Sequence, residues 1–488
     1  MLTIVMVKEL KSILLSPKFP ATFGVCSLLL LLSVYIGVNE YQASVRRYDT
    51  AGQLVEQQVR EARSWHQLSN RVYRAPNPMQ VFVSGVSNDI GRTSIIDPTD
   101  QVKLTNSAYS DEPIYAVFRF IDFAFIVQVV FSLFAILFTY DSINGEGESG
   151  TLQLTFANAV PRVHYVVGKF VGSWLGLVVP LTIPILLSIL IVIAYGLPLT
   201  TQHWFAVAGL VGISLLYFTF FIAFGTFVSA MAKRSSVSFL ASLVAWIVMT
   251  FIIPRAGVMA AGTLHPVASI AEVESQRDAF ATQAWTRHRQ KMEVRFQTRE
   301  QELRAKTKQD REAYNEAHQW QWMEQEDNAR KEIMKEIDKY GAQLEEGSRN
   351  AREEQVRLAL TLSRFSPASV YQIASMTLAG SNIDLKTTFE DALNTYRTTF
   401  ISFKQKKEKE SGDTGGIRIS VDSEKGFSFQ VGRESGALGL SDMPRFVGSL
   451  FSFHEVLSTA LVDIGLLFLF TVLTIAGTFV AFLRYDVR

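Results

Sequence analysis

The chain has 488 residues, a hydrophobic fraction of 48%, and 47 basic against 46 acidic side chains, which gives a formal net charge of +1 at pH 7. Because basic and acidic residues alternate, the sequence offers no general attraction for nucleic acid. The single cysteine, Cys26, lies in an apolar run and excludes both an intramolecular disulfide and a thiolate metal cluster. The apolar residues gather in blocks of about 20, the length that crosses a bilayer, so the chain is predicted to reside in a lipid membrane.

Six stretches are long and apolar enough to form transmembrane helices. They are residues 19–38, 116–139, 170–195, 204–230, 236–254 and 460–483. The first follows Lys8, Lys11 and Lys18 and superficially resembles a signal peptide, but it is longer than a cleavable apolar region of about 7 to 15 residues. It is therefore expected to remain as a spanning helix.

The positive residues of the short loops predict the orientation of these spans. All of them fall on one face of the six-span arrangement, at Lys8, Lys11, Lys18, Arg162, Lys169, Lys233, Arg234, Arg484 and Arg488. Short loops rich in Lys and Arg stay in the cytoplasm. Both termini and the loop 140–169 are therefore expected on the cytoplasmic side of a bacterial cytoplasmic (inner) membrane.

This orientation divides the chain into five parts. In chain order they are an N-terminal interfacial helix with the first span, a first outer segment, four spans with a cytoplasmic loop, a large outer segment, and the last span with its tail. Their bounds are residues 1–38, 39–115, 116–254, 255–459 and 460–488.

The two outer segments are predicted to be mainly helical. The first is expected to be a helix from about Gln42 to Arg74, and residues 267–362 carry apolar residues at helical spacing among many charges, with a break near Gly341 or Gly347 that folds them into a hairpin. We read these charges as a solvated helix face and expect this insert to be separable from the membrane part. Apolar residues at every second position then predict a β-hairpin, with strands from Ile417 to Val421 and from Phe427 to Val431. The fold class is thus an α-helical polytopic membrane protein, with six transmembrane helices and a mainly helical extracytoplasmic domain that contains a small β-hairpin.

The sequence contains no recognisable catalytic motif. The nearest fragment to a phosphate-binding loop is Gly168-Lys169, but Phe170 stands where Ser or Thr would hold magnesium. A nucleophile elbow, a zinc-binding helix and a Cys-His cluster are also missing from the sequence. We therefore predict no catalytic residue, no bound metal and no cofactor in this chain, which is not expected to be an enzyme.

Three ionisable residues fall within or beside the spans, at two places in the chain. Arg119 and Asp122 are three residues apart at the outer end of the second span and can face one another on one side of a helix. An ionisable pair inside a membrane is a candidate functional site, although near the interface it can equally be a local ion pair. Asp463, near the start of the last span, is open to the same two readings.

The most informative stretch lies between the second and third spans. Gly145, Gly147 and Gly150 interrupt the spanning helix, and two carboxylates, Glu146 and Glu148, precede a new short helix whose N-terminal dipole favours them. A short helix lying flat beneath the membrane is the expected result. On the residues alone, a capped turn explains the pattern equally well.

The order of residues in this stretch resembles the signature of type-2 ABC transporter permeases. The pattern Gly-Glu-x-Glu-x-Gly-Thr-Leu begins at residue 145 and is followed by Pro161-Arg162 and Gly168-Lys169. The resemblance implies that residues from about 145 to 160 form a coupling helix, which docks onto a separate ATPase subunit that binds ATP and Mg. It further implies a set of coupling residues, namely Gly145, Glu146, Glu148, Gly150, Thr151, Leu152, Pro161 and Arg162. Gly147 departs from the family pattern, which commonly has a larger side chain there.

The outer insert also resembles a subgroup of these permeases with a large extracytoplasmic domain between spans five and six, through Phe365-Ser366-Pro367-Ala368 and Leu378-Ala379-Gly380. Two functions follow as hypotheses. The chain is either an exporter subunit that pairs with a second permease, identical or paralogous, or a scaffold that uses ATP hydrolysis to act on a periplasmic partner without moving cargo. A sensor with an outer ligand domain is a third reading, and it lacks a recognisable cytoplasmic output domain.

The predicted orientation can be tested by cysteine labelling. In a Cys26→Ser background, a membrane-impermeant thiol reagent should label Glu300→Cys in intact spheroplasts and leave Gly147→Cys unlabelled, because residue 300 is expected outside and residue 147 inside. The reverse pattern would contradict the orientation.

Overall fold

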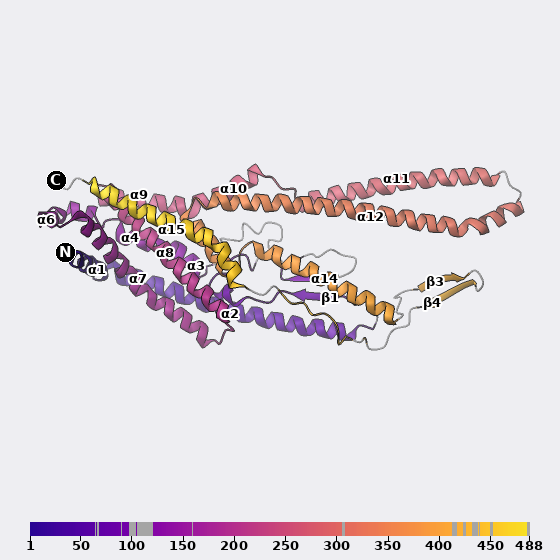
Figure 1. The fold of residues 1–488 in the computed structure, drawn as a ribbon, viewed down its shortest axis with the longest axis horizontal. Helices are drawn as coiled ribbons and strands as arrows, with labels where there is room; N and C mark the ends of the chain where they lie inside the picture. Colours follow the sequence, from indigo (N-terminus) through magenta and orange to yellow (C-terminus); the bar gives the residue numbers. More distant parts are fainter. Residues whose placement is uncertain are drawn as a thin grey trace. The chain divides into compact units, whose positions relative to one another are not determined.

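The computed structural model describes residues 1–63, 65, 68–88, 90–96, 104, 121–158, 160–304, 308–411, 417–422, 426–431, 438, 440–448 and 452–485. Of the residues that the structure describes, 81% are helical. It divides into two compact units (Figure 1). The first comprises Met1–Pro254 and Ser363–Arg488, and the second comprises Arg255–Leu362.

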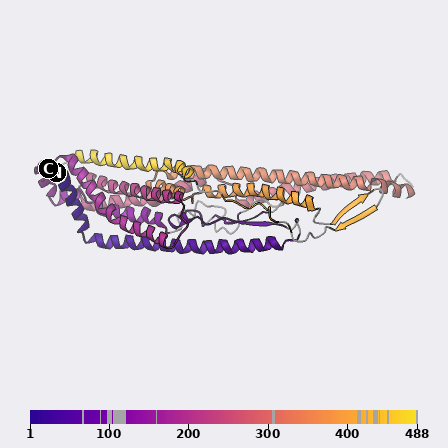
Figure 2. The ribbon, with the colours of Figure 1, turned by 60° about the horizontal axis from the view of Figure 1, so that its bottom comes forward.

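Six helices among the described residues are long and apolar enough to cross a membrane, in agreement with the six predicted spans. They are Lys18–Glu61 (α2), Phe123–Glu148, Arg162–Ala194 (α7), Thr201–Met231 (α8), Ser235–Leu264 and Phe453–Leu483 (α15). Both ends of the chain lie at the same end of the bundle (Figures 1 and 2), where the buried side chains of Val5 and Phe482 belong to one apolar cluster. An even number of spans requires this arrangement.

The second and fifth spans each contain a π-helical segment. The second span consists of Phe123–Phe125 (α3), Ile126–Phe131 (η3) and Ser132–Thr139 (α4), and the fifth of Ser235–Ile247 (α9), Val248–Ile252 (η4) and Ile253–Leu264 (α10). Trp246 of α9 donates its indole N–H to Ser132 Oγ at 2.8 Å and so links the two spans. The Gln128 carbonyl in η3 accepts a hydrogen bond of 3.0 Å from Tyr217 of α8. Interhelical hydrogen bonds of this kind join the two irregular spans to their neighbours.

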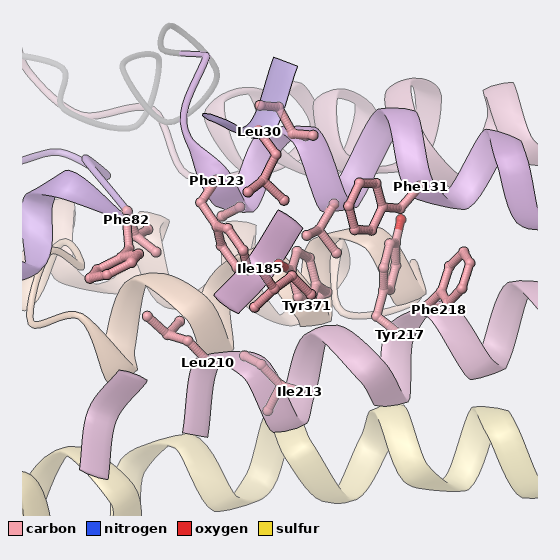
Figure 3. Packing of buried hydrophobic residues seen from close by; sticks show 14 of the residues in the cluster. Leu30, Phe82, Phe123, Phe131, Ile185, Leu210, Ile213, Tyr217, Phe218 and Tyr371 are labelled. Atoms are coloured by element: carbon pink, nitrogen blue, oxygen red, sulfur yellow. The ribbon is translucent and has the colours of Figure 1, made fainter. Parts of the chain in front are cut away.

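A short helix packs inside the same unit as the spans. This is α13, Pro367–Leu378, in which ten of the 12 residues are buried. Tyr371 stacks on Tyr217 with ring centroids 4.5 Å apart, and its hydroxyl lies 3.0 Å from Ser214 Oγ (Figure 3). Tyr217 stands near the middle of α8. Residues 367–378, which fall within the predicted outer segment, pack against the spanning helix α8.

The rest of the first unit extends from the ends of the spans. It contains Asn70–Tyr73 (β1), Pro78–Val81 (η1), Thr93–Ile96 (β2) and Asp384–Ser411 (α14), and a separate apolar core joins α2, β1, β2 and α14. The predicted helix from Gln42 to Arg74 is confirmed only as far as Glu61, where α2 ends. Residues Asn70–Tyr73 form a strand because they pair antiparallel with β2.

The predicted β-hairpin is confirmed. Ile417–Asp422 (β3) pairs antiparallel with Gly426–Val431 (β4), and Ile419 stands opposite Phe429. The residues expected to form its turn, 423–425, lie outside the described part of the chain.

The second unit begins within α10 and consists mainly of two long helices, Ile270–Arg304 (α11) and Lys308–Ser363 (α12), of which α12 continues by one residue into the first unit. They run antiparallel: Phe280 stacks on Tyr340 with centroids 4.1 Å apart, and Arg287 pairs with Glu336 at 3.3 Å. The predicted hairpin is confirmed, but its position is wrong, since Gly341 and Gly347 both lie inside α12. A methyl group on Gly341 would lie 3.1 Å from the Arg277 side chain, so this glycine makes room for the neighbouring helix.

Candidate functional site

The stretch singled out by the sequence folds into two short helices, Asn144–Glu148 (α5) and Thr151–Ala157 (α6), which we call the coupling segment. Gly150 separates them with a φ of +72°, in the left-handed region that glycine adopts without strain. Thr151 donates its hydroxyl to the Glu146 carbonyl at 3.3 Å and stabilises the turn. The buried Asn144 fixes the start of the segment: Ser229 donates to its side-chain oxygen at 3.2 Å, and Ser235 Oγ lies 3.2 Å from the same oxygen.

The Glu146 carboxylate is the centre of a charge network. One of its oxygens lies 2.7 Å from Lys8 Nζ and 2.9 Å from Lys169 Nζ, and the other accepts a hydrogen bond of 2.7 Å from the Tyr165 hydroxyl. The Glu146 side chain is only 13% exposed. The carboxylate therefore binds the N-terminal helix Leu2–Leu14 (α1) and α7 to the coupling segment.

A second carboxylate completes this network. Glu9 of α1 pairs with Lys169 Nζ at 2.6 Å and accepts a hydrogen bond of 3.1 Å from Ser173. Both Glu9 and Lys169 are buried. Buried charges are tolerated when they are paired and hydrogen-bonded, and Lys169 meets this condition through two carboxylates from different elements.

A row of glycines allows α1 to approach α7 closely. Gly168, Gly172 and Gly176 recur every four residues and so lie along one face of the helix. A methyl group on Gly172 would lie 2.7 Å from Glu9 Cβ and 2.8 Å from the Met6 carbonyl. Only a residue without a side chain fits there, and the Glu9 to Lys169 pair depends on this approach.

Glu148 makes a different contact. Its two oxygens accept hydrogen bonds from the Ser235 N–H and hydroxyl, both at 2.9 Å. Ser235 is the first residue of α9, so the carboxylate stands at a helix N-terminus, where the backbone N–H groups and the helix dipole favour an anion. Glu148 is exposed, and it fixes the coupling segment to the fifth span.

Three further predicted coupling residues contact other parts of the same chain or begin a helix. Leu152 is buried in an apolar cluster with Tyr165 and Phe482. Arg162 donates to the Leu483 carbonyl at 2.7 Å and so caps the C-terminal end of α15, and Pro161 precedes the first turn of α7. The structure thus brings together the residues of the sequence motif around one small cluster.

The outward face of α6 was not predicted from the sequence. Leu154 is 67% exposed, and Gln153 beside it is exposed as well. Residues two apart on a helix point in nearly opposite directions. The burial of Leu152 therefore directs Leu154 away from the bundle, and this alternation is the signal that could have identified it.

The predicted intramembrane pair is only partly described. Arg119 lies outside the described residues. Asp122 caps the second span, where its carboxylate accepts hydrogen bonds from the Phe125 and Ser84 N–H groups at 2.8 and 2.9 Å. Asp463 of α15 pairs with Arg364, which lies far away in sequence. Among the described residues, no group of three or more His, Cys, Asp or Glu side chains is placed to hold a metal ion.

The comparison with protein families agrees with this arrangement. The family described as "ABC-2 family transporter protein" matches residues 4–487, nearly the whole chain. The protein belongs to this family and is a membrane-embedded permease subunit of an ABC transporter. Subunits of this kind work with an ATPase subunit and are generally not enzymes themselves. The search of curated proteins finds no match.

The two glutamates of the motif should differ in their effect on stability. Glu146→Lys places a third cation beside Lys8 and Lys169 and removes the acceptor of Tyr165, so we expect the free energy of unfolding to fall by about 1.5 to 3 kcal/mol, the usual worth of a hydrogen bond to a charged group. Glu148→Lys makes the same chemical change at an exposed position that contacts Ser235, and it should lower the free energy of unfolding by less than Glu146→Lys does. Thermal unfolding of both variants in detergent measures the difference. Equal midpoints would show that the Glu146 network does not stabilise the fold.

Proposed function

We propose that the coupling segment docks onto a separate ATPase subunit, and that ATP hydrolysis in that subunit drives export of a substrate through the membrane part. In this proposal ATP and Mg bind to the ATPase, and this chain pairs with a second permease, identical or paralogous. Both termini face the cytoplasm of a bacterial cell, in its cytoplasmic membrane. We further propose that the chain belongs to the subgroup with an extracytoplasmic domain between spans five and six, which the long helical insert supports.

One observation carries this proposal. The inner face of the coupling segment is fixed by ion pairs and by the buried Leu152, whereas its outer face presents Leu154, an exposed leucine. A large apolar side chain held outward on a rigid support is typical of a protein-protein contact. We infer that Leu154 and Gln153 contact the ATPase, and that Glu146 and Glu148 position them.

The ion network supports a route for the movement. Glu146 binds α1 and α7, and Glu148 binds the start of α9, so a force on α6 acts on three helices together. Because these contacts are short and include buried charges, the segment and the attached helix ends would move as one body. In this proposal the glutamates of the family motif hold the docking surface in place and do not themselves form it.

A second function is favoured by the outer insert. The chain would then be a scaffold in which ATP-driven movement of the spans acts on a periplasmic partner, with no cargo passing through. The long helices α11 and α12 favour this alternative. Helices of 35 and 56 residues with many surface charges suit transmission of movement outside the membrane better than binding of an apolar cargo.

Leu154→Glu tests the docking surface. Loss of a buried leucine contact costs about 1.5 to 3 kcal/mol, which corresponds to roughly a tenfold to hundredfold weaker association. The variant should fold normally but fail to co-elute with the ATPase subunit and fail to stimulate ATP turnover.

Val294→Glu is the matched control for this experiment. Val294 is 62% exposed on α11, in the outer insert, and is similar to Leu154 in exposure and apolar character. This variant should assemble with the ATPase and stimulate it as the wild type does. Normal assembly and stimulation by Leu154→Glu would refute the proposed docking surface.

A further inference from the structure

A tight bend at residues 364–366 joins the end of α12 to the start of α13. We call this bend, together with the first two residues of α13, the turn (residues 364–368). It contains the Phe365-Ser366-Pro367-Ala368 sequence, which lies outside the coupling segment and has no role in the proposed docking of the ATPase. We propose that this turn is a second coupling site, which transmits movement of the spans to the helical insert. The inference rests on the proposed function, since it requires the spans to move when the ATPase turns over.

The sixth span contacts the turn through an ion pair. Two nitrogens of the Arg364 guanidinium group donate to the Asp463 carboxylate. Nε lies 2.6 Å from Oδ1, and Nη2 lies 3.1 Å from Oδ2. The Asp463 side chain is 2% exposed and belongs to the apolar helix α15. A two-point Arg–carboxylate contact fixes both distance and orientation. Any displacement of α15 at this level therefore acts on Arg364.

The fifth span contacts the turn through Ser366. Its hydroxyl accepts hydrogen bonds from the N–H groups of Ala368 and Ser369, at 3.1 and 3.3 Å, and so caps α13. The same hydroxyl donates to the Met249 carbonyl in the π-helical segment η4. In a π-helix this carbonyl would bond the N–H of the residue five positions on, which is Pro254 and has none. Pro254 thus leaves Met249 free to bind the turn.

The second span contacts the turn through its own π-helical segment. Gln128 of η3 donates its side-chain N–H to the Ala368 carbonyl at 3.4 Å. The turn is thereby bound to the second, fifth and sixth spans within a few residues. Irregular backbone at two of these three contacts matches the tendency of π-helical segments to occur at functional positions.

The position of the turn in the chain shows which element these contacts would move. The residues before it form α12, one helix from Lys308 to Ser363, and the residues after it form the buried α13. A continuous helix carries a displacement of its end along its length, since every turn is hydrogen-bonded to the next. Arg364, Ser366 and Asp463 act here as positioning residues between moving spans and α12.

The test is hydrogen exchange measured by mass spectrometry on the full chain with its ATPase in lipid nanodiscs, with and without ATP and vanadate. In the wild type, trapping should alter exchange both in the coupling segment, residues 144–157, and in the helical insert, residues 270–362. In Asp463→Asn the change in the insert should be lost while the change in the coupling segment persists. Ser366→Ala leaves the ion pair intact and should reduce the change in exchange in the insert. It tests the same inference if Asp463→Asn does not fold.

Glu56→Gln is the matched control, because it neutralises an exposed carboxylate that pairs with Arg60 on α2, away from the turn. It should leave both exchange responses unchanged. A response in the insert that persists in Asp463→Asn and in Ser366→Ala, or that is missing from the wild type, would overturn this inference and leave the proposed function standing. A wild type without any response in the coupling segment would overturn both.

Discussion

The pairing of Lys169 with two carboxylates is the interaction on which the arrangement of the coupling segment depends. Lys169 is buried at the start of a spanning helix, and a buried ammonium group requires anions within reach. Glu9 and Glu146 supply them from opposite sides, one from α1 and one from α5. Because the charge must be satisfied, the N-terminal helix lies along the glycine face of α7 and the coupling segment closes over both. The Glu146 and Lys169 positions of the family motif are thus explained by the need to compensate one buried charge.

The Arg364 to Asp463 pair plays a comparable part at the turn before α13. There too, a nearly buried charge in a spanning helix is neutralised by a residue from a segment that does not span. Each pair makes the position of a short element dependent on the position of a span. If ATP hydrolysis moves the spans, both short elements must follow or lose a buried ion pair, which costs about 3 to 5 kcal/mol. The same physical device would then serve at the docking surface and at the helical insert.

The sequence predicted the features that depend on local pattern. The six spans follow from apolar length and the β3–β4 hairpin from alternation. The short helix α6 was expected after the glycines, but Gly145, Gly147 and both glutamates lie inside a further short helix, α5. The features it missed depend on distant partners. Helix α13 is too short to register as a span, and β1 forms only because β2 is available for pairing. The break of the hairpin formed by α11 and α12 was misplaced for the same reason, since Gly341 lies in contact with α11 and not in a turn. Equally, nothing in the sequence near Glu146 reveals that Lys8 and Lys169 will meet it.

The central claim is that Glu146 supports the docking surface from within and that Leu154 forms it. A cryo-electron microscopy structure of the complex with its ATPase subunit tests this claim most directly. We expect Leu154 to be buried against the ATPase while the Glu146 carboxylate remains within ion-pair distance of Lys8 and Lys169. A complex in which Glu146 has left both lysines to bind the ATPase, with Leu154 still exposed to solvent, would contradict the account.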